Sequence, residues 1–309
     1  MVDLKYPPPP EFFKPECRND YDVSVEMKSV WAVELDLAQE LLRVCKKHNL
    51  KMFADFGTLL GAARHKGFIP WDDDMDFSML REDYEKMCRI APYEFKHPYF
   101  FQYSNSGKEF INGHAKLRNS MTTGIVKDEM KRNLNYNQGI FIDILPIDNV
   151  SDNEFVGFVQ IRLAHFFWFI MLCFAYFSSR YFESDSFWRI PKKIVHILFN
   201  RPFRLLQLGT YKLWMFFCKL YSSEKTKNVA GMSFPNVVKK QLRADYEQDV
   251  MADFEFTKLP IMRNHDRVLT NWFGDWRVPK MAKNDHGEVL FDANVPYTKY
   301  LSPNNEEMN

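Results

Sequence analysis

Residues 69–80 read IPWDDDMDFSML, and this stretch says most about both the fold and the chemistry of the chain. Four of the five positions from 72 to 76 are carboxylates, whose mutual repulsion is costly unless something compensates it. Apolar residues alternate from Met75 to Leu80, which predicts a β-strand. Because side chains alternate between the two faces of a strand, Asp74 and Asp76 project from one face while Met75 and Phe77 point into the core.

Two carboxylates on one face of a strand can ligate one hard cation together. Asp72 shares the parity of Asp74 and Asp76, whereas Asp73 faces elsewhere. The alternative is a solvated acidic turn, because short motifs of this kind often arise without function. We favour the metal site, since a purely solvated run has no need of the alternating apolar residues that follow it.

The segments before the acidic run predict a helix, a strand and a phosphate-binding turn. Apolar residues recur at helical spacing over 24–49, and the aromatic-rich run 51–56 is typical of a strand that ends at Gly57. A glycine here, followed by Thr58 and the helix-compatible run 59–64, lets backbone N–H groups approach a phosphate. An ordinary strand-to-helix turn is the alternative.

A third carboxylate, Asp143, interrupts an otherwise apolar strand-like run from Gly139 to Leu145. A charge inside a buried strand needs a reason. Asp143 either caps the end of a strand, completes the shell of a two-metal site, or accepts the proton of a nucleophile. Together with the positive charges of Arg64 and Lys66, the acids predict a site for a metal-bound phosphate substrate.

Residues 57–76, GTLLGAARHKGFIPWDDDMD, closely resemble the signature of the LicD family, whose core pattern fukutin-related proteins share. The inserted segment 64–71 is typical of the LicD branch, and it separates the glycine turn from the acid pair by more than in the wider nucleotidyltransferase superfamily. The resemblance covers the chain from about 25 to 279. It continues through the segments 81–84 (REDY), 139–148 (GIFIDILPID), 254–255 (FE) and 272–276 (WFGDW).

Helices and strands interleave irregularly in the first half, which predicts an α+β fold. The resemblance implies a nucleotidyltransferase-like mixed sheet core with a helical insertion. It also implies transfer of a phosphorylated alcohol, such as phosphocholine or phosphoribitol, from a CDP-activated donor to a glycan hydroxyl, with release of CMP. The implied metal is Mg²⁺, with Mn²⁺ as the alternative ion.

Carried over by position, Asp74 and Asp76 resemble the paired metal ligands of the family, and Asp143 the third acid; these three are the candidate catalytic residues. Asp72 is a candidate outer partner of the metal. The candidate substrate-binding residues are Gly57, Thr58, Arg64, Lys66 and Trp71.

The composition divides the chain into an N-terminal extension (1–23), a catalytic core (24–150), a basic aromatic helical insertion (151–225) and a C-terminal part that completes the domain (226–309). Seventeen uncharged residues lie between Arg162 and Arg180, which is marginal for a membrane span that needs roughly 20. The stretch from Ser186 to Ser223 carries seven Lys and Arg and no acid. It is either a packed helical subdomain or a peripheral contact with an anionic membrane surface.

The overall composition narrows the class of partner and the compartment. Lys and Arg total 41 against 40 Asp and Glu, so no charge excess favours nucleic acid as a partner. The five cysteines are scattered without a C-x-x-C pair, which favours neither a zinc site nor a disulfide framework. No apolar leader is visible at the start. We therefore expect a cytoplasmic enzyme working at the inner face of the membrane on a glycan or lipid-linked glycan acceptor.

Two other functions stay open at this point. The first is nucleotidyl transfer, in which the nucleoside monophosphate stays on the acceptor. The second is a catalytically inactive module that binds glycan or a lipid surface, which the basic aromatic stretch favours and the complete set of signature acids opposes.

Overall fold

The computed structural model describes residues 1–104, 106, 110–127, 136–179, 189–233, 239–280 and 288–301, with the backbone alone for 176–179 and 189–201. Its centre is strand β8 (Phe141–Val150), which is buried along its whole length. Strand β4 (Asp76–Leu80) runs parallel to β8, and β6 (Ala115–Asn119) runs antiparallel along its first residues. β9 (Asn228–Ala230) pairs antiparallel with its last residues.

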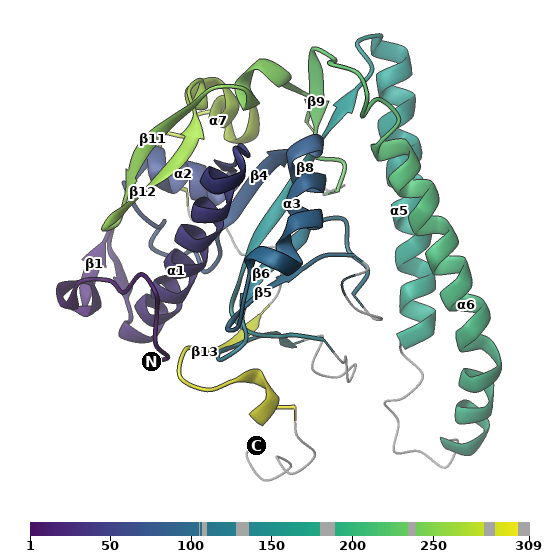
Figure 1. Ribbon diagram of the computed structural model, residues 1–309, viewed down its shortest axis with the longest axis horizontal. Helices are drawn as coiled ribbons and strands as arrows, with labels where there is room; N and C mark the ends of the chain where they lie inside the picture. The colour runs from purple at the N-terminus through teal and green to yellow at the C-terminus, as the bar shows by residue number, and fades with distance from the viewer. Residues whose placement is uncertain are drawn as a thin grey trace.

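Three further strands extend this mixed sheet: β3 pairs with β4, β5 with β6, and β10 with β9. Parallel and antiparallel pairs thus occur together beside helices (Figure 1), and the predicted α+β fold is confirmed. The outer strands are β3 (Phe53–Ala54), β5 (Tyr99–Gln102) and β10 (Gln241–Leu242).

Helix α1 (Val25–His48) fulfils the prediction for residues 24–49 almost residue by residue. The Ser24 hydroxyl accepts a hydrogen bond from the backbone N–H of Met27, which caps the first turn. Asn49 ends the helix in the left-handed conformation that asparagine tolerates. Trp31 and other apolar side chains of α1 are completely buried in the main core.

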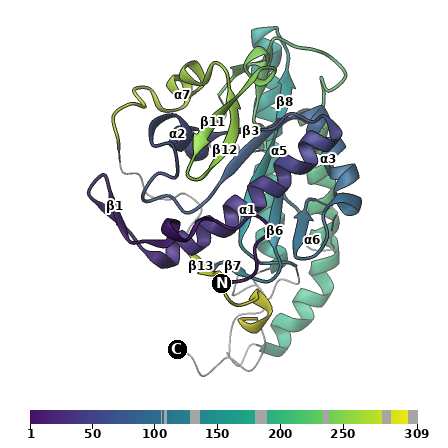
Figure 2. The ribbon, with the colours of Figure 1, turned by 60° about the vertical axis from the view of Figure 1, so that its left-hand side comes forward.

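Helix α3 (Arg81–Glu94) packs beside α1 on one face of the sheet, as Figures 1 and 2 both show. The two helices are tied at their ends, because Lys47 donates to the Glu94 carboxylate and Lys86 donates to the carbonyl of His48. The predicted helix 81–90 is confirmed and runs one turn further than expected. These two helices form the layer that supports β4 and β8.

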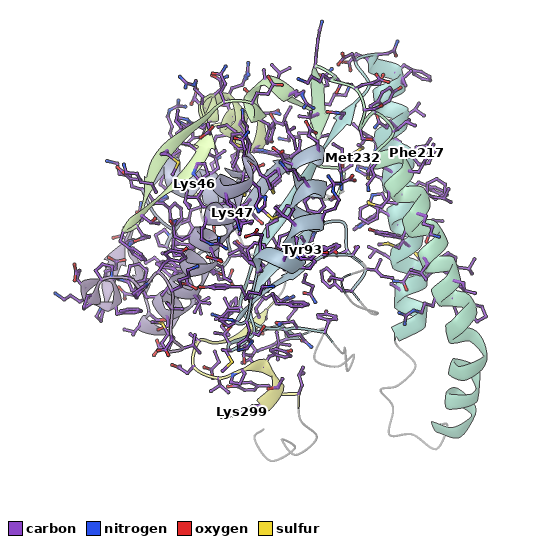
Figure 3. The ribbon with its side chains drawn as sticks, in the orientation of Figure 1. Lys46, Lys47, Tyr93, Phe217, Met232 and Lys299 are labelled. Atoms are coloured by element: carbon purple, nitrogen blue, oxygen red, sulfur yellow. The ribbon has the colours of Figure 1, made fainter. Side chains whose placement is uncertain are left out.

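Helices α5 (Glu154–Ser179) and α6 (Arg189–Cys218) form a long hairpin along the side of the sheet (Figure 1). Its root is hydrogen-bonded to the end of β8: Gln160 donates to the Asn149 carbonyl and accepts from the Ser151 N–H. A second apolar cluster fills this junction, where Figure 3 labels Phe217 and Met232. The start of the predicted basic stretch, 186–188, lies outside the described residues.

The remaining elements surround the sheet. β11 and β12 form an antiparallel hairpin that packs with α2 and α7 near β3, and β7 pairs with β13. A small hairpin of β1 and β2 precedes α1. The bounds are β1 (Glu16–Arg18), β2 (Tyr21–Val23), α2 (Phe56–Arg64), β7 (Thr123–Val126), β11 (Asp249–Phe254), β12 (Thr257–Met262), α7 (His265–Phe273) and β13 (Val289–Asp292), with 3₁₀ turns at Pro10–Phe13, Arg243–Tyr246 and Tyr297–Lys299.

Candidate functional site

The first residues of β4 and β8 bring two of the predicted acids together. Asp76 is the register partner of Asp143 in the parallel pair, and the Asp143 N–H donates to the Met75 carbonyl at 2.9 Å. Neighbouring strands lie about 4.8 Å apart, so the two carboxylates start from adjacent backbone positions. Met75 and Phe77 are fully buried, as their alternation predicted, while Asp76 stays partly exposed.

The carboxylates crowd one another electrostatically. Burial is the largest influence on Asp76 and raises its pKa, and the charges of Asp74, Asp143 and Asp72 raise the pKa further, well above its usual range. A carboxyl that resists ionisation because its neighbours are negative gains most from a nearby cation. The acid pair predicted from strand parity therefore lies in a field that favours a bound positive charge.

Asp143 has a different surrounding, because two basic side chains face it. Lys116 Nζ lies 2.9 Å and 2.7 Å from the two carboxylate oxygens, and His114 Nε2 lies 3.3 Å from Oδ1. Burial alone would raise the pKa of Asp143, but Lys116 and His114 outweigh it and lower the pKa below its usual range. Asp143 is therefore held ionised, which suits a ligand or an electrostatic role better than proton acceptance.

Sequence reasoning missed Lys116 and His114. Lys116 lies in β6, and His114 directly precedes this strand. Lys116 is the antiparallel register partner of Asp143. A lysine that alternates with the apolar Ala115 and Leu117 was the available signal. It does not indicate which strand lies opposite, because pairing between distant strands cannot be read from local alternation.

The N-terminal turn of α2 lies against the acidic run. A β-carbon on Gly57 would stand 2.6 Å from Asp72 Oδ2, so a larger residue here would displace the Asp72 carboxylate. The Thr58 hydroxyl accepts a hydrogen bond from the Asp76 N–H at 2.8 Å. Gly57 and Thr58 lie in the first turn of the helix rather than in a turn before it, because Asp55 caps the helix by accepting from the Phe56 N–H.

The comparison with protein families agrees with this geometry. The family model for the LicD/FKTN/FKRP nucleotidyltransferase domain matches residues 49–211, which include the acidic run, the α2 turn and Asp143. The chain belongs to this family. Its match extends into α6 and leaves out α1.

The chain is also similar to individual proteins. The lipopolysaccharide cholinephosphotransferase LicD of Haemophilus influenzae is 25% identical over 238 residues, which cover 75% of this chain and 84% of that protein. Uncharacterised proteins of Rickettsia prowazekii and Rickettsia typhi are each 41% identical over 56 residues, or 18% of this chain and 21% and 18% of theirs.

Other parts of the LicD-like pattern have structural roles. Glu255 accepts hydrogen bonds from Arg18 at 2.5 Å and from the Phe68 N–H at 2.9 Å, and a β-carbon on Gly67 would strike its carboxylate. It thereby holds the segment that leads into the acidic run. Arg81 forms an ion pair with the buried Asp148 at 2.6 Å. This pair lies near the end of β8, whereas Asp143 lies near its start.

Three predicted substrate-binding residues contact other parts of the protein. Arg64 donates to the Trp276 carbonyl at 2.8 Å, and Lys66 is exposed beside β11. Trp71 lies edge-on to Tyr21 and lines a cavity of about 370 Å³. The substrate roles of these three residues stay predictions.

Glu34 is a further acid that the sequence did not single out. It lies one turn along α1 from Trp31, whose indole N–H donates to the Asp72 carbonyl at 3.0 Å. Glu34 is completely buried, and within the described residues neither carboxylate oxygen has a hydrogen-bond partner. Burial is the main cause that raises its pKa well above the usual range, followed by Asp74, Asp73 and Asp72.

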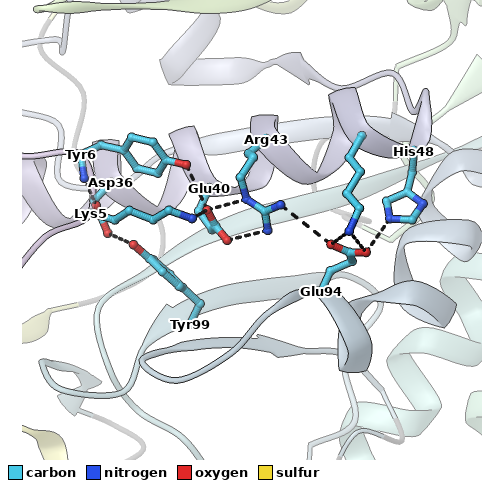
Figure 4. Close-up of polar contacts among 9 residues, drawn as sticks. Lys5, Tyr6, Asp36, Glu40, Arg43, His48, Glu94 and Tyr99 are labelled. Atoms are coloured by element: carbon cyan, nitrogen blue, oxygen red, sulfur yellow. Dashed lines mark hydrogen bonds and ion pairs between the residues drawn. The ribbon is translucent and has the colours of Figure 1, made fainter.

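The other buried acids of α1 are satisfied (Figure 4). Asp36 accepts from the Tyr6 N–H and the Tyr99 hydroxyl, and Glu40 accepts from Lys5 and Arg43. Glu34 is thus the exception among these three, and it is the one that faces the acidic run. The raised pKa of Glu34 has the same charge cause as that of Asp76, because the acidic run opposes ionisation of both carboxyls.

The residues fit a small hard cation. Within the described residues no group of three His, Cys, Asp or Glu is gathered closely enough to enclose a metal ion. Mg²⁺ does not require such a cage, because it is usually bound by one or two carboxylates together with water and substrate phosphates. Asp74 and Asp76 would supply that pair, and the charges of Asp74, Asp143 and Asp72 all act on Asp76.

Proposed function

We propose that this LicD-family protein transfers phosphocholine or a phospho-polyol from a CDP-activated donor to a glycan hydroxyl and releases CMP. The observation that carries the proposal is the register pair Asp76 and Asp143 beside the α2 N-terminus, inside the matched family region. The name of the Haemophilus relative, a lipopolysaccharide cholinephosphotransferase, supports phosphotransfer to a surface glycan. The acceptor class would be lipopolysaccharide, teichoic acid or a lipid-linked precursor.

The reaction is an in-line displacement at phosphorus. The acceptor oxygen forms a new bond to the phosphorus that carries the alcohol, the bond to the CMP oxygen breaks, and the hydroxyl proton passes to solvent or to a basic group. Asp74 and Asp76 would hold Mg²⁺, or Mn²⁺ in its place, which when bound neutralises charge on the donor pyrophosphate. Asp143, kept ionised by Lys116 and His114, would orient that end of the site.

Two other features of the chain suit a phosphorylated donor. The backbone N–H groups in the first turn of α2, next to Gly57, offer the positive end of a helix to an anion. Lys116 adds a cation on the opposite side of the acids. We further propose that the protein works in the cytoplasm at the inner face of the membrane, where activated donors and lipid-linked acceptors meet.

The test is metal-dependent CMP release with CDP-choline, CDP-ribitol and CDP-glycerol as separate donors. We expect one donor to react, and Asp76→Asn to reduce turnover by roughly 10²–10³, as loss of one preorganised charge at a reacting phosphate does. Asp73→Asn is the matched control, because Asp73 is a neighbouring carboxylate that is not among the candidate metal ligands, so this variant should retain turnover.

Product analysis separates the alternatives. A product that retains the nucleoside monophosphate would replace phosphoalcohol transfer by nucleotidyl transfer. Wild-type turnover in Asp76→Asn would contradict the assignment of the site. Failure of calorimetry to detect metal-dependent nucleotide binding would favour the inactive binding module instead.

A further inference from the structure

The outer face of α5 is apolar although it faces away from the rest of the protein. Phe155, Phe158, Phe166 and Phe169 are exposed, with 75% of the Phe155 side chain and 60% of the Phe169 side chain accessible. Their spacing of three, eight and three residues places them on one helical face. The opposite face, which includes Ala164, packs on the sheet side of the hairpin.

Helix α6 continues this face. Leu205, Leu213, Phe216 and Leu220, the last just beyond its end, are exposed, while Trp214 is fully buried against the domain. The two helices are antiparallel neighbours. Ring contacts of Phe167 with Phe217 and of Phe174 with Phe203 lie between them. The two exposed ridges therefore lie next to each other and form one surface, which we call the outer hairpin face.

The outer hairpin face is not part of the buried core of the protein. The segment Glu154–Ala175 is long and apolar enough to cross a membrane, yet only 17% of its most apolar window is buried inside the protein. Soluble monomers scatter single exposed apolar side chains, but a contiguous patch marks a surface that is covered by something else. The outer hairpin face is such a patch.

The charge of the hairpin indicates what covers the face. After Glu154, the described parts of α5 and α6 contain no acidic residue. Arg162 lies within the α5 ridge, with its guanidinium over the Phe158 ring at 5.1 Å, and Lys212 is exposed beside the α6 ridge. An apolar strip edged by cations is complementary to a bilayer surface with anionic headgroups.

The same charges argue against a spanning hairpin. Helix α6 carries Arg201, Arg204 and Lys212 in its middle portion, and charged side chains deep in hydrocarbon are strongly unfavourable. Within the part of the chain that the structure describes, α5 alone meets the length and hydropathy of a span. Two helices lying in the interface keep the cations at the headgroups and the phenylalanine rings below them.

We propose that the outer hairpin face docks on a bilayer that contains anionic lipid, with α5 and α6 lying in the plane of the interface. The hairpin is fixed to β8 through Gln160 and through Asn149, whose side chain donates to the Tyr221 and Glu224 carbonyls. Docking therefore holds the strand that carries Asp143 at a set orientation to the membrane. This inference stands on the exposed face alone and does not depend on the reaction.

The experiment is co-sedimentation of the full chain with vesicles of phosphatidylcholine alone and of phosphatidylcholine mixed with phosphatidylglycerol. We expect binding to the mixed vesicles that weakens with salt. The double variant Phe166→Asp with Phe169→Asp should reduce partitioning by at least about tenfold, because charges replace two exposed rings that the proposal places in the bilayer interface. Tyr93→Asp is the matched control, since Tyr93 is 79% exposed on α3 and lies off the hairpin (Figure 3).

A second variant separates charge from apolar contact. Lys212→Glu should weaken binding to the mixed vesicles and leave binding to phosphatidylcholine unchanged. Circular dichroism should show that every variant folds, since all four substituted positions are solvent-exposed.

Three outcomes would overturn the proposal. The first is equal sedimentation of the wild type and the Phe166→Asp with Phe169→Asp variant. The second is absence of vesicle binding together with a dimer, seen by analytical ultracentrifugation, that this variant dissociates; the face would then belong to a second copy. The third is retention of the wild type in membranes after alkaline extraction, which would show a spanning hairpin.

Discussion

The two ends of β8 each bury an aspartate beside a cation, but they balance charge differently. Towards the hairpin, Asp148 has 0% exposure and pairs one to one with Arg81, which is also buried. At the start of the strand, Asp143 forms an ion pair with Lys116, and the charges of Asp74 and Asp143 both raise the pKa of Asp76. The first arrangement balances its charge within the protein, although Arg81 Nη2 and Asp148 Oδ2 have no hydrogen-bond partner among the described residues. The second carries an excess of negative charge, which the proposed metal ion would neutralise.

The largest stability effect should follow from breaking the buried Arg81–Asp148 pair. Asp148→Asn leaves Arg81 buried without its counter-charge, and removal of one partner of a buried pair costs about 3–5 kcal/mol. Urea unfolding at neutral pH measures it. Replacement of both partners, Arg81→Met with Asp148→Leu, should recover much of the loss. If Asp148→Asn unfolds like the wild type, the pair contributes little and the contrast between the two ends fails.

The same substitution at the other end should act on catalysis instead. Asp143→Asn should lower CMP release by roughly 10²–10³, equivalent to about 3–4 kcal/mol in the barrier. Its free energy of unfolding should fall by less than that of Asp148→Asn, because Lys116 loses a partner but removal of the Asp143 charge also relieves the repulsion that raises the pKa of Asp76. A loss of stability as large as that of Asp148→Asn, with turnover retained, would make Asp143 a structural acid.

Local pattern predicted the parts of this contrast that lie within one element. Alternation correctly predicted that Met75 and Phe77 are buried, and helical periodicity correctly predicted α1. Because β4 begins at Asp76, strand parity does not extend to Asp74, and the shared face of the two acids stays a prediction. The charge of Asp143 inside an apolar run indicated a site, but its partner Lys116 depends on the pairing of β6 with β8, which no local pattern specifies. The start of α2 moved to Phe56 because the Asp55 side chain caps it, which hydrophobic spacing alone does not show.

The acid-rich end should also make stability depend on pH. Burial raises the pKa of Asp55 to about 6, against hydrogen bonds from Ser78 and Phe56 that lower it. The folded state then binds more protons than the unfolded chain between about pH 4 and 6, so stability falls as pH rises through that window. The shift of about two units corresponds to about 3 kcal/mol.

The Asp55 contribution is isolated by comparing urea unfolding of the wild type and Asp55→Asn at several pH values. The variant keeps an oxygen that can cap α2 but has no proton to lose, so its stability should depend less on pH between 4 and 6. Identical pH profiles for the two proteins would show that Asp55 ionises normally in the folded state.

The smallest expected effect distinguishes two buried acids of one helix. Glu34 has no hydrogen-bond partner within the described residues and faces the acidic run, so Glu34→Gln should stabilise the metal-free protein by about 1–2 kcal/mol at neutral pH. The amide removes a charge that its surroundings oppose, and it can donate towards the neighbouring carboxylates. Glu40→Gln should act in the opposite direction by a similar amount, because Lys5 and Arg43 lose their counter-charge. Urea unfolding of both variants measures the sign. If both substitutions destabilise, Glu34 has a partner in solution, and the negative excess at this end of β8 is smaller than its surroundings indicate.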